Sequence, residues 1–403
     1  MSTQNNTQKK SLASRGMIAV LIAQFISALA DNALLFAAIA LLKSNSAPDW
    51  QIPMLQEFFV IAFIILAPFV GPFADSYPKG HVMLIANMLK LIGASAMFVG
   101  LNPLLSYGLV GLGAAAYSPA KYGILSELVS SDKLVKANGM MEGSTIVAIL
   151  LGAVIGGKLA DNAASTALIA VCICYLIAAF ANMLIPRLPA AKQHQTFRPA
   201  PLIQNFVGAL KTLFKNRDAR LSLLGTSIFW GAGSTLRLLL VAWVPVALSI
   251  TDLSLPANLS GAVAVGIAVG AALAASTISL KNINCVLPVG IAIGLLIMIF
   301  AHSTNLYIAI GLLVLIGGTG GFYVVPLNAL LQERGHETVG AGNAVAVQNF
   351  FENCTMLVLV GLYIMMQKNN IPVVQVATIF GMVIFVAISV LAWSRLRYKS
   401  PIS

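Results

Sequence analysis

Seven ionisable side chains lie inside long apolar segments of the sequence, where a charge has few polar neighbours. These residues are Asp31, Glu57, Lys90, Lys121, Glu142, Arg237 and Glu352. A charged side chain near the middle of a membrane helix costs about 2.5–3.5 kcal/mol on insertion scales. Such charges are tolerable only where they line a wet cavity or pair with one another. The set therefore predicts a polar site inside a membrane protein.

Asp31 and Arg237 are the most informative of these residues. Asp31 lies near the middle of the first apolar segment, and Arg237 lies near the middle of the seventh. The planar guanidinium group can bind two oxygens of a phosphate or carboxylate at once. Asp31 would accept an ammonium group, a sodium ion or a proton. The two residues together suit a zwitterion, whereas an internal salt bridge is the alternative explanation for each of the seven charges.

Polar and aromatic residues on the same segments extend this predicted site. The predicted substrate-binding residues are Gln24, Asp31, Asn32, Tyr117, Lys121, Glu142, Trp230, Arg237, Asn349 and Glu352. Hydrogen bonds between helices would explain the uncharged members equally well. Sodium at Asp31 is the one metal ion that this prediction includes.

The motifs of enzyme chemistry are missing from the sequence. Residues 152–158 have the G-x-x-x-x-G-K spacing of a phosphate-binding loop, but Leu159 stands where a hydroxyl would hold magnesium. No histidine precedes an aspartate by five positions, as in membrane acyltransferases, and no G-x-S-x-G elbow occurs. The four cysteines lie in apolar segments without a Cys-x-x-Cys motif. We therefore expect neither an enzyme nor a bound cofactor.

The composition requires a membrane environment. Of the 403 residues, 59% are hydrophobic and 9% are charged, whereas a soluble chain carries about 25% charged residues. The net charge of +11 does not indicate nucleic acid, because the basic residues occupy short gaps between apolar segments. Pairs of glycines four positions apart predict close helix contacts. These pairs are Gly152 with Gly156, Gly266 with Gly270, and Gly317 with Gly321.

Twelve segments are long and apolar enough to predict membrane-spanning helices. They lie near residues 17–42, 53–74, 82–100, 103–126, 138–160, 164–186, 221–249, 257–280, 285–302, 305–331, 339–366 and 371–394. Lysine and arginine gather in alternate connections, while the other side holds only Lys43 and Lys368, with Lys158 near an edge. Because basic residues favour the cytoplasmic side, we expect both termini to be cytoplasmic.

One long, proline-containing connection divides the chain into two similar halves. We predict an all-α membrane protein with a six-helix bundle over residues 1–186, a cytoplasmic linker over 187–220 and a second six-helix bundle over 221–403. Both fourth spans contain a proline, Pro119 and Pro326, which suggests an internal repeat of the kind found in secondary transporters. Within the linker, apolar residues between Leu202 and Phe214 have helical spacing. They predict a helix on the anionic membrane surface, with a simple tether as the alternative.

Twelve spans in two halves with a long central connection resemble the major facilitator superfamily. The gate motif of that superfamily between spans two and three is matched in part, by Gly71, Asp75, Lys79 and Gly80. Ser76 and Pro78 stand where the motif has a basic residue and a glycine. The resemblance implies the major facilitator fold with an incomplete cytoplasmic gate.

A more specific resemblance covers nearly the whole chain. Segments 23–36, 113–125, 229–237 and 325–335 are similar to the bacterial lysophospholipid transporters. The resemblance implies a multi-pass protein of the bacterial inner membrane that moves lysophosphatidylethanolamine and related lysophospholipids from the outer to the inner leaflet by alternating access. It also implies a cytoplasmic-side partner, an acyltransferase–acyl carrier protein synthetase. The family's expected polar site corresponds to Asp31, Lys121 and Arg237.

Two other functions are compatible with the residues. An exporter of cationic or amphipathic drugs would have a cavity dominated by acidic and aromatic side chains, which Lys121 and Arg237 disfavour. A membrane scaffold that recruits the acyltransferase would have all its buried charges paired and would move no solute. The sequence leaves the energy source open among a proton gradient, a sodium gradient and downhill movement.

Overall fold

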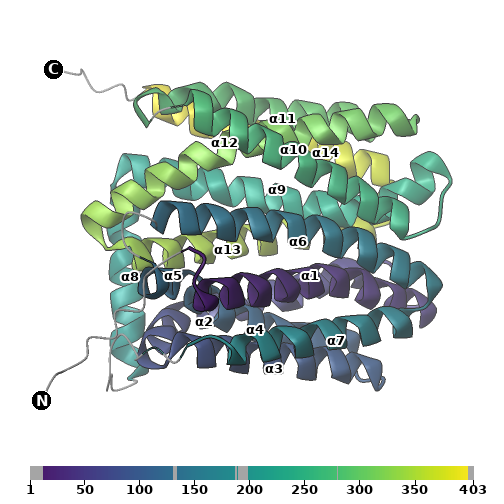
Figure 1. Ribbon diagram of the computed structural model, residues 1–403. Helices are drawn as coiled ribbons and strands as arrows, with labels where there is room; N and C mark the ends of the chain where they lie inside the picture. Colours follow the sequence, from purple (N-terminus) through teal and green to yellow (C-terminus); the bar gives the residue numbers. More distant parts are fainter. Residues whose placement is uncertain (1–11, 130–133, 187, 189–197, 279, 398–403) are drawn as a thin grey trace, which may run out of the picture.

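The computed structural model describes residues 12–129, 134–186, 188, 198–278 and 280–397 (Figure 1). Within these residues the regular secondary structure is entirely helical. The helices of the first half are α1 (Arg15–Ser44), α2 (Gln51–Ser76), α3 (Lys79–Phe98), α4 (Pro103–Gly123), α5 (Leu125–Leu128), α6 (Leu134–Asn162) and α7 (Ala164–Met183). Those that follow are α8 (Pro199–Lys215), α9 (Arg217–Leu248), α10 (Ser254–Thr277), η2 (Leu280–Cys285), α11 (Val286–Ala301), α12 (Leu306–Thr338), α13 (Ala341–Lys368) and α14 (Val373–Arg397).

Eleven helices in the described part of the chain are long and apolar enough to cross a membrane. The remaining predicted span corresponds to α4, whose sequence is rich in glycine, alanine and polar residues. Its small residues let neighbouring backbones approach closely, because a Cβ atom at Gly111 would lie 2.7 Å from the Phe59 carbonyl oxygen. On the other side, a Cβ atom at Gly113 would lie 2.6 Å from the Ala86 carbonyl oxygen. Helix α4 is thus held between α2 and α3.

The long helices pack side by side in two groups, α1–α7 and α9–α14 (Figure 1). The two groups meet mainly where α2 packs on α13 and where α6 packs on α10. Asparagine side chains begin several helices by accepting hydrogen bonds from the first free backbone N–H groups. Asn102, Asn216 and Asn305 cap α4, α9 and α12 in this way. Local side-chain caps therefore fix where these helices begin, and contacts between apolar faces hold the helices together.

The predicted glycine contacts are confirmed. A Cβ atom at Gly152 would lie 2.5 Å from the Leu29 carbonyl oxygen, so α6 and α1 touch through their backbones. The closest approach joins α10 and α12, where a Cβ atom at Gly270 would lie 1.9 Å from the Gly318 carbonyl oxygen. Small residues give tight backbone contact inside a membrane, where no hydrophobic force drives helices together.

Helix α8 crosses the ends of the other helices at one end of the molecule, which we name the α8 end (Figure 1). The predicted helix in the linker is confirmed, and part of its apolar face packs against the protein. Leu213 is fully buried, and Phe206, Leu210 and Phe214 pack with it against α9, α12 and α13. These four apolar residues therefore cover the protein, whereas Ile203 and Val207 are exposed. The opposite end of the molecule is called the far end below.

The contact between α10 and α12 gives a first test of the fold. Replacing Gly270 by alanine should lower the stability by about 1–3 kcal/mol, because the added methyl group collides with backbone that cannot move aside. Thermal unfolding of the purified protein in detergent measures this loss. Gly311→Ala on α12 is the matched control, since nothing lies within 4 Å of its added Cβ atom. Equal unfolding temperatures for the two variants would contradict the packing described here.

Candidate functional site

Asp31 lies at the centre of a hydrogen-bonded network inside the first group of helices. The ammonium group of Lys90 on α3 donates to Asp31 Oδ2 over 2.7 Å, and the Tyr175 hydroxyl on α7 donates to Asp31 Oδ1 over 2.8 Å. Lys90 also donates to Ser27 Oγ at 3.1 Å, and Ser27 donates to Asn87 Oδ1 at 2.7 Å. The network joins α1, α3 and α7 and compensates two charges that the apolar interior would otherwise disfavour.

The two ends of this ion pair differ in accessibility. The side chain of Lys90 is 2% exposed, whereas that of Asp31 is 22% exposed. The Lys90 nitrogen also lies 4.9 Å from the ring centroid of Tyr117, within the range of a cation–π contact. Tyr117 is buried, and its hydroxyl has no hydrogen-bond partner among the described residues. The carboxylate is therefore the group of this pair that an incoming ligand could reach.

Arg237 connects α9 to α1 across the boundary between the two groups of helices. Its guanidinium group donates to the side-chain oxygen of Asn32 at 3.0 Å and to the backbone oxygen of Asn32 at 3.2 Å. The guanidinium carbon lies 5.3 Å from the ring centroid of Phe36. The Nε atom is buried without a hydrogen-bond partner, and no described carboxylate forms a salt bridge with Arg237. The charge is thus held by neutral groups alone.

Asp31 and Arg237 do not bond to each other. Asp31 and the Asn32 that binds Arg237 are consecutive residues of α1, so their side chains diverge by about 100° around the helix. One points to α3 and α7, and the other points to α9. The structure therefore brings the acid and the base to the same turn of α1 with separate partners. For Asp31, the salt bridge named as the alternative is present, and its partner is Lys90.

A third polar cluster lies inside the second group of helices. Gln348 Nε2 donates to Glu352 Oε1 at 2.7 Å and to Asn328 Oδ1 at 2.7 Å. Glu352 is 8% exposed, and Asn349 contributes its backbone oxygen to Asn353. This cluster links α12 to α13 and shows no direct bond to Asp31 or Arg237.

The remaining predicted site residues are placed as follows. Gln24 donates to Thr145 on α6 at 3.0 Å. Trp230 is 40% exposed and stands edge-on to Phe229. Lys121 is buried, with its nitrogen 4.4 Å from the ring centroid of Tyr122. The side chain of Glu142 lies outside the part that the structure describes.

The residues of the predicted gate motif bond within the first group of helices. Lys79 is buried and forms a salt bridge with Glu127 on α5. Gly71 has open space around it, and the side chain of Asp75 lies outside the described part. At the same end of the second group, Asp218 pairs with Arg334 at 3.0 Å and with Arg395 at 2.7 Å. These described ion pairs at the α8 end stabilise each group separately.

The polar contacts at the far end join the two groups, and sequence reasoning missed them. Both carboxylate oxygens of Asp161, at the end of α6, accept backbone hydrogen bonds from Leu253 and Ser254 at the start of α10. Lys368 at the end of α13 places its nitrogen 4.0 Å from the ring centroid of Trp50, which precedes α2. An aspartate directly after the predicted span 138–160 was the available signal. The described conformation is therefore closed at the far end.

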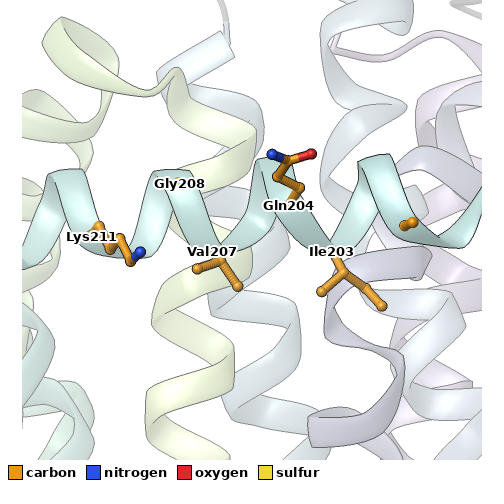
Figure 2. Close-up of a pocket in the computed structure, with 6 residues that line it drawn as sticks. Ile203, Gln204, Val207, Gly208 and Lys211 are labelled. Atoms are coloured by element: carbon orange, nitrogen blue, oxygen red, sulfur yellow. The ribbon is translucent and has the colours of Figure 1, made fainter.

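A groove of about 530 Å³ lies on the outer face of α8, lined by Ala200, Ile203, Gln204, Val207, Gly208 and Lys211. Figure 2 shows Ile203 and Val207 pointing to one side of the helix and Gln204 to the other. All of these residues are exposed. None of the predicted substrate-binding residues lines this groove.

Comparison with known proteins identifies the class of protein first. Residues 20–354 match the family model of the Major Facilitator Superfamily. The fold is similar to two crystal structures of the nucleoside transporter NupG. A point mutant of NupG aligns with a TM-score of 0.73 at 14% identity over 95% of this chain and 99% of that one, and a second NupG structure aligns with a TM-score of 0.69 at 15% identity over the same shares. The arrangement is that of a membrane transporter.

Curated relatives narrow the family further. The chain is 55% identical to the lysophospholipid transporter LplT of Klebsiella pneumoniae (strain 342), over 96% of this chain and 97% of the relative. It is 54% identical to LplT of Enterobacter sp. (strain 638), over 98% and 99%. The chain belongs to the bacterial lysophospholipid transporters of the Major Facilitator Superfamily. It is a multi-pass inner-membrane transporter and not an enzyme.

A double-mutant cycle can isolate the interaction free energy of the Asp31–Lys90 pair from the contributions of its neighbours. Lys90→Met should destabilise the protein by on the order of 3 kcal/mol, because it leaves the Asp31 carboxylate without its cation. Adding Asp31→Asn should restore most of that stability, since no isolated charge remains. Thermal unfolding of the two single variants and the double variant gives the coupling. Additive losses would show that the two side chains do not interact.

The far-end closure gives a second expectation. Asp161→Ala removes the acceptor of two backbone hydrogen bonds and should shift the population toward a conformation open at the far end. Distances between spin labels on Asn45→Cys and Asn369→Cys, in a background lacking native cysteines, report this shift because both positions are exposed at that end. Asp252→Asn, an exposed acid nearby, is the control. An unchanged distance distribution in Asp161→Ala would remove Asp161 from the closure.

Proposed function

We propose that this protein moves lysophospholipids, lysophosphatidylethanolamine among them, from the outer to the inner leaflet of the bacterial inner membrane by alternating access. The proposal draws on relatives named lysophospholipid transporters, which are 53–55% identical over nearly their full length. It also draws on the chemistry of the polar groups around α1. A lysophospholipid has one acyl chain, which stays in lipid, and a charged head group, which cannot cross hydrocarbon unaided.

One observation carries the proposal: among the described residues, the guanidinium group of Arg237 donates hydrogen bonds only to the neutral Asn32, and its Nε–H has no partner. A phosphate can replace the amide of Asn32 without breaking any ion pair. The guanidinium would then exchange a neutral acceptor for a charged one, and charge-assisted hydrogen bonds are about twice as strong as neutral ones. The head group thus offers Arg237 the counterion that the described protein does not.

Asp31 supplies the second contact in this proposal. Its carboxylate belongs to the same turn of α1 as Asn32 and is the exposed end of its ion pair with Lys90. The ammonium group of a phosphoethanolamine head would share this carboxylate with Lys90. Tyr175 already donates to the other carboxylate oxygen and would fix its orientation. Phosphate at Arg237 and ammonium at Asp31 place the zwitterion along α1.

Alternating access follows from where the two groups of helices touch. Asn32 belongs to the first group and Arg237 to the second, so a head group bound at both is held by both. Rocking of one group against the other would move the opening from the far end to the α8 end. We assign the α8 end to the cytoplasm because of its basic residues. With α4 as a further span, the two groups become six-helix bundles at 1–186 and 221–403, joined by the linker at 187–220.

Delivery to the inner leaflet is useful if a cytoplasmic enzyme consumes the product. The acyltransferase–acyl carrier protein synthetase expected from the resemblance would restore the second acyl chain there. Removal of the lysophospholipid would keep its net movement downhill. In this proposal the transporter itself makes and breaks no covalent bond.

The test is flipping of labelled lysophosphatidylethanolamine by purified protein in liposomes. Arg237→Ala should reduce the initial rate at least ten-fold, because the phosphate loses its bidentate partner. Arg237→Lys should give an intermediate rate, since an ammonium group keeps the positive charge but cannot bind two phosphate oxygens in the bidentate geometry of a guanidinium group. Arg220→Ala removes an exposed arginine from the same helix and should leave the rate unchanged.

Two results would contradict the proposal. A wild-type rate in folded Arg237→Ala would exclude Arg237 from the head-group site. Transport of cationic drugs by the purified protein, with no transport of the lysophospholipid, would favour an exporter of amphipathic cations instead.

A further inference from the structure

Helices α2 and α13 form one of the two contacts between the groups of helices and run antiparallel along it. Near the far end, Trp50 at the start of α2 meets Lys368 at the end of α13. Seven residues after Trp50 and seven residues before Lys368, Glu57 lies beside Gly361. An added Cβ atom at Gly361 would lie 3.6 Å from Glu57 Oε1. Seven residues are two helical turns, so the two contacts lie on one line about 10 Å apart. Glu57 is therefore buried inside the boundary that must part when the far end opens.

Glu57 has no compensating partner in the described conformation. The residue is 4% exposed, and both carboxyl oxygens are buried without a hydrogen-bond partner in the described part of the chain. Gly361 has no side chain that could donate a hydrogen bond. Asp31, by contrast, is equally an acid within a membrane helix and has both a lysine and a tyrosine as partners. Among the described residues, Glu57 is a buried acid that has neither a salt bridge nor a hydrogen-bond donor.

The neighbouring titratable and charged groups are occupied elsewhere. On the helices packed against α2 they include Asp31, Lys43, Lys90, Tyr107, Arg237, Glu352, Tyr363 and Lys368. Glu352 accepts a hydrogen bond from Gln348. Lys368 lies over Trp50, the Tyr363 hydroxyl accepts from Gln367, and Arg237 binds Asn32. The Tyr107 ring packs on Phe59, and Asp31 pairs with Lys90. Lys43 lies in the last turn of α1 and is exposed.

An ionised carboxylate in such a place would lose its hydration without replacement, which costs several kcal/mol. A carboxylic acid avoids most of this cost because it carries no net charge. When α2 and α13 separate, water reaches the group, and the ionised form becomes the stable one. Closing the contact again requires that the carboxylate take up a proton.

We propose that Glu57 is a proton-binding site whose occupancy controls the α2–α13 contact: the protonated acid belongs to the conformation closed at the far end, and the carboxylate belongs to the open one. On opening, the O–H bond of the acid breaks, its electron pair stays on the carboxylate, and the proton passes to water at the far end. On closing, the reverse transfer occurs. One proton is therefore released and rebound in each cycle of opening at that end, whichever solute is carried.

The expected effect has a definite sign. Low pH favours the closed conformation, because that conformation binds one proton more than the open one. For a single proton, the ratio of closed to open molecules falls by up to about ten-fold for each unit of rising pH, over the range in which the open form is ionised and the closed form is not. The dependence vanishes if the acid is replaced by a group that cannot ionise.

The experiment uses the full chain in liposomes without substrate, with Cys172, Cys174, Cys285 and Cys354 replaced by serine. Spin labels on Asn45→Cys and Asn369→Cys measure the far-end distance between pH 5.5 and 8.5. We expect the closed fraction to fall with rising pH, the ratio of closed to open changing at least ten-fold. In Glu57→Gln, which imitates the protonated acid, the closed fraction should stay high and change less than two-fold.

Three further variants keep the result specific. Gly361→Ala adds a methyl group at ordinary van der Waals distance and keeps the acid, so it should retain the pH response. Asp252→Asn removes an exposed acid at the same end and should also retain it. If Glu57→Gln does not fold, Glu57→Asp takes its place and should keep a pH response with a displaced midpoint.

The proposal is overturned by a pH-independent distance distribution in the otherwise unchanged chain. An undiminished pH response in Glu57→Gln, or no response in folded Glu57→Asp, overturns it as well. Because no lysophospholipid is present, these outcomes are separate from the flipping assay that tests the proposed function.

Discussion

An ionised side chain in an apolar interior needs a counter-charge, hydrogen bonds or water, and this requirement organises the middle of the protein. Asp31 meets it with Lys90 and Tyr175, and Glu352 meets it in part with Gln348. Arg237 meets it with the oxygens of Asn32, and Glu57 has no partner among the described residues. Where the charge of a side chain is compensated less completely, binding of a ligand, uptake of a proton or a conformational change can lower the free energy more.

The two ends of the molecule use their polar contacts differently. At the α8 end, the described ion pairs Lys79–Glu127 and Asp218–Arg334 lie within one group of helices. At the far end, Asp161 and Lys368 bridge between groups. Contacts within a group keep it rigid, whereas contacts between groups favour one conformation over another. Such a distribution suits a molecule whose halves move as units.

Helices, close glycine contacts and buried charges were readable from the sequence, because each depends on local composition or spacing. Gly266 and Gly270 needed only their spacing to indicate a tight contact. The partners of the buried charges could not be predicted. Asp31 and Arg237 were expected at matching depths, but in the fold Asp31 pairs with Lys90, and Arg237 binds Asn32, the residue after Asp31. The apolar spacing of α8 predicted a helix correctly. It did not indicate that Phe206 and Leu213 pack against protein, because protein and lipid are equally apolar neighbours.

Under the proposed function, the amide at position 32 explains why Arg237 remains available to a substrate phosphate. An acid there would satisfy the guanidinium permanently, and a substrate phosphate would have to displace a carboxylate from a low-dielectric site, at a cost comparable with what it gains. An apolar residue would leave the guanidinium with the backbone oxygen of position 32 as its remaining described acceptor. Asn32 holds the guanidinium in place through two neutral oxygens and can be displaced by an anion at small cost. A transport site has to bind its ligand and also release it. Both steps can proceed when the guanidinium group has hydrogen-bond acceptors in the protein but no permanent counter-charge.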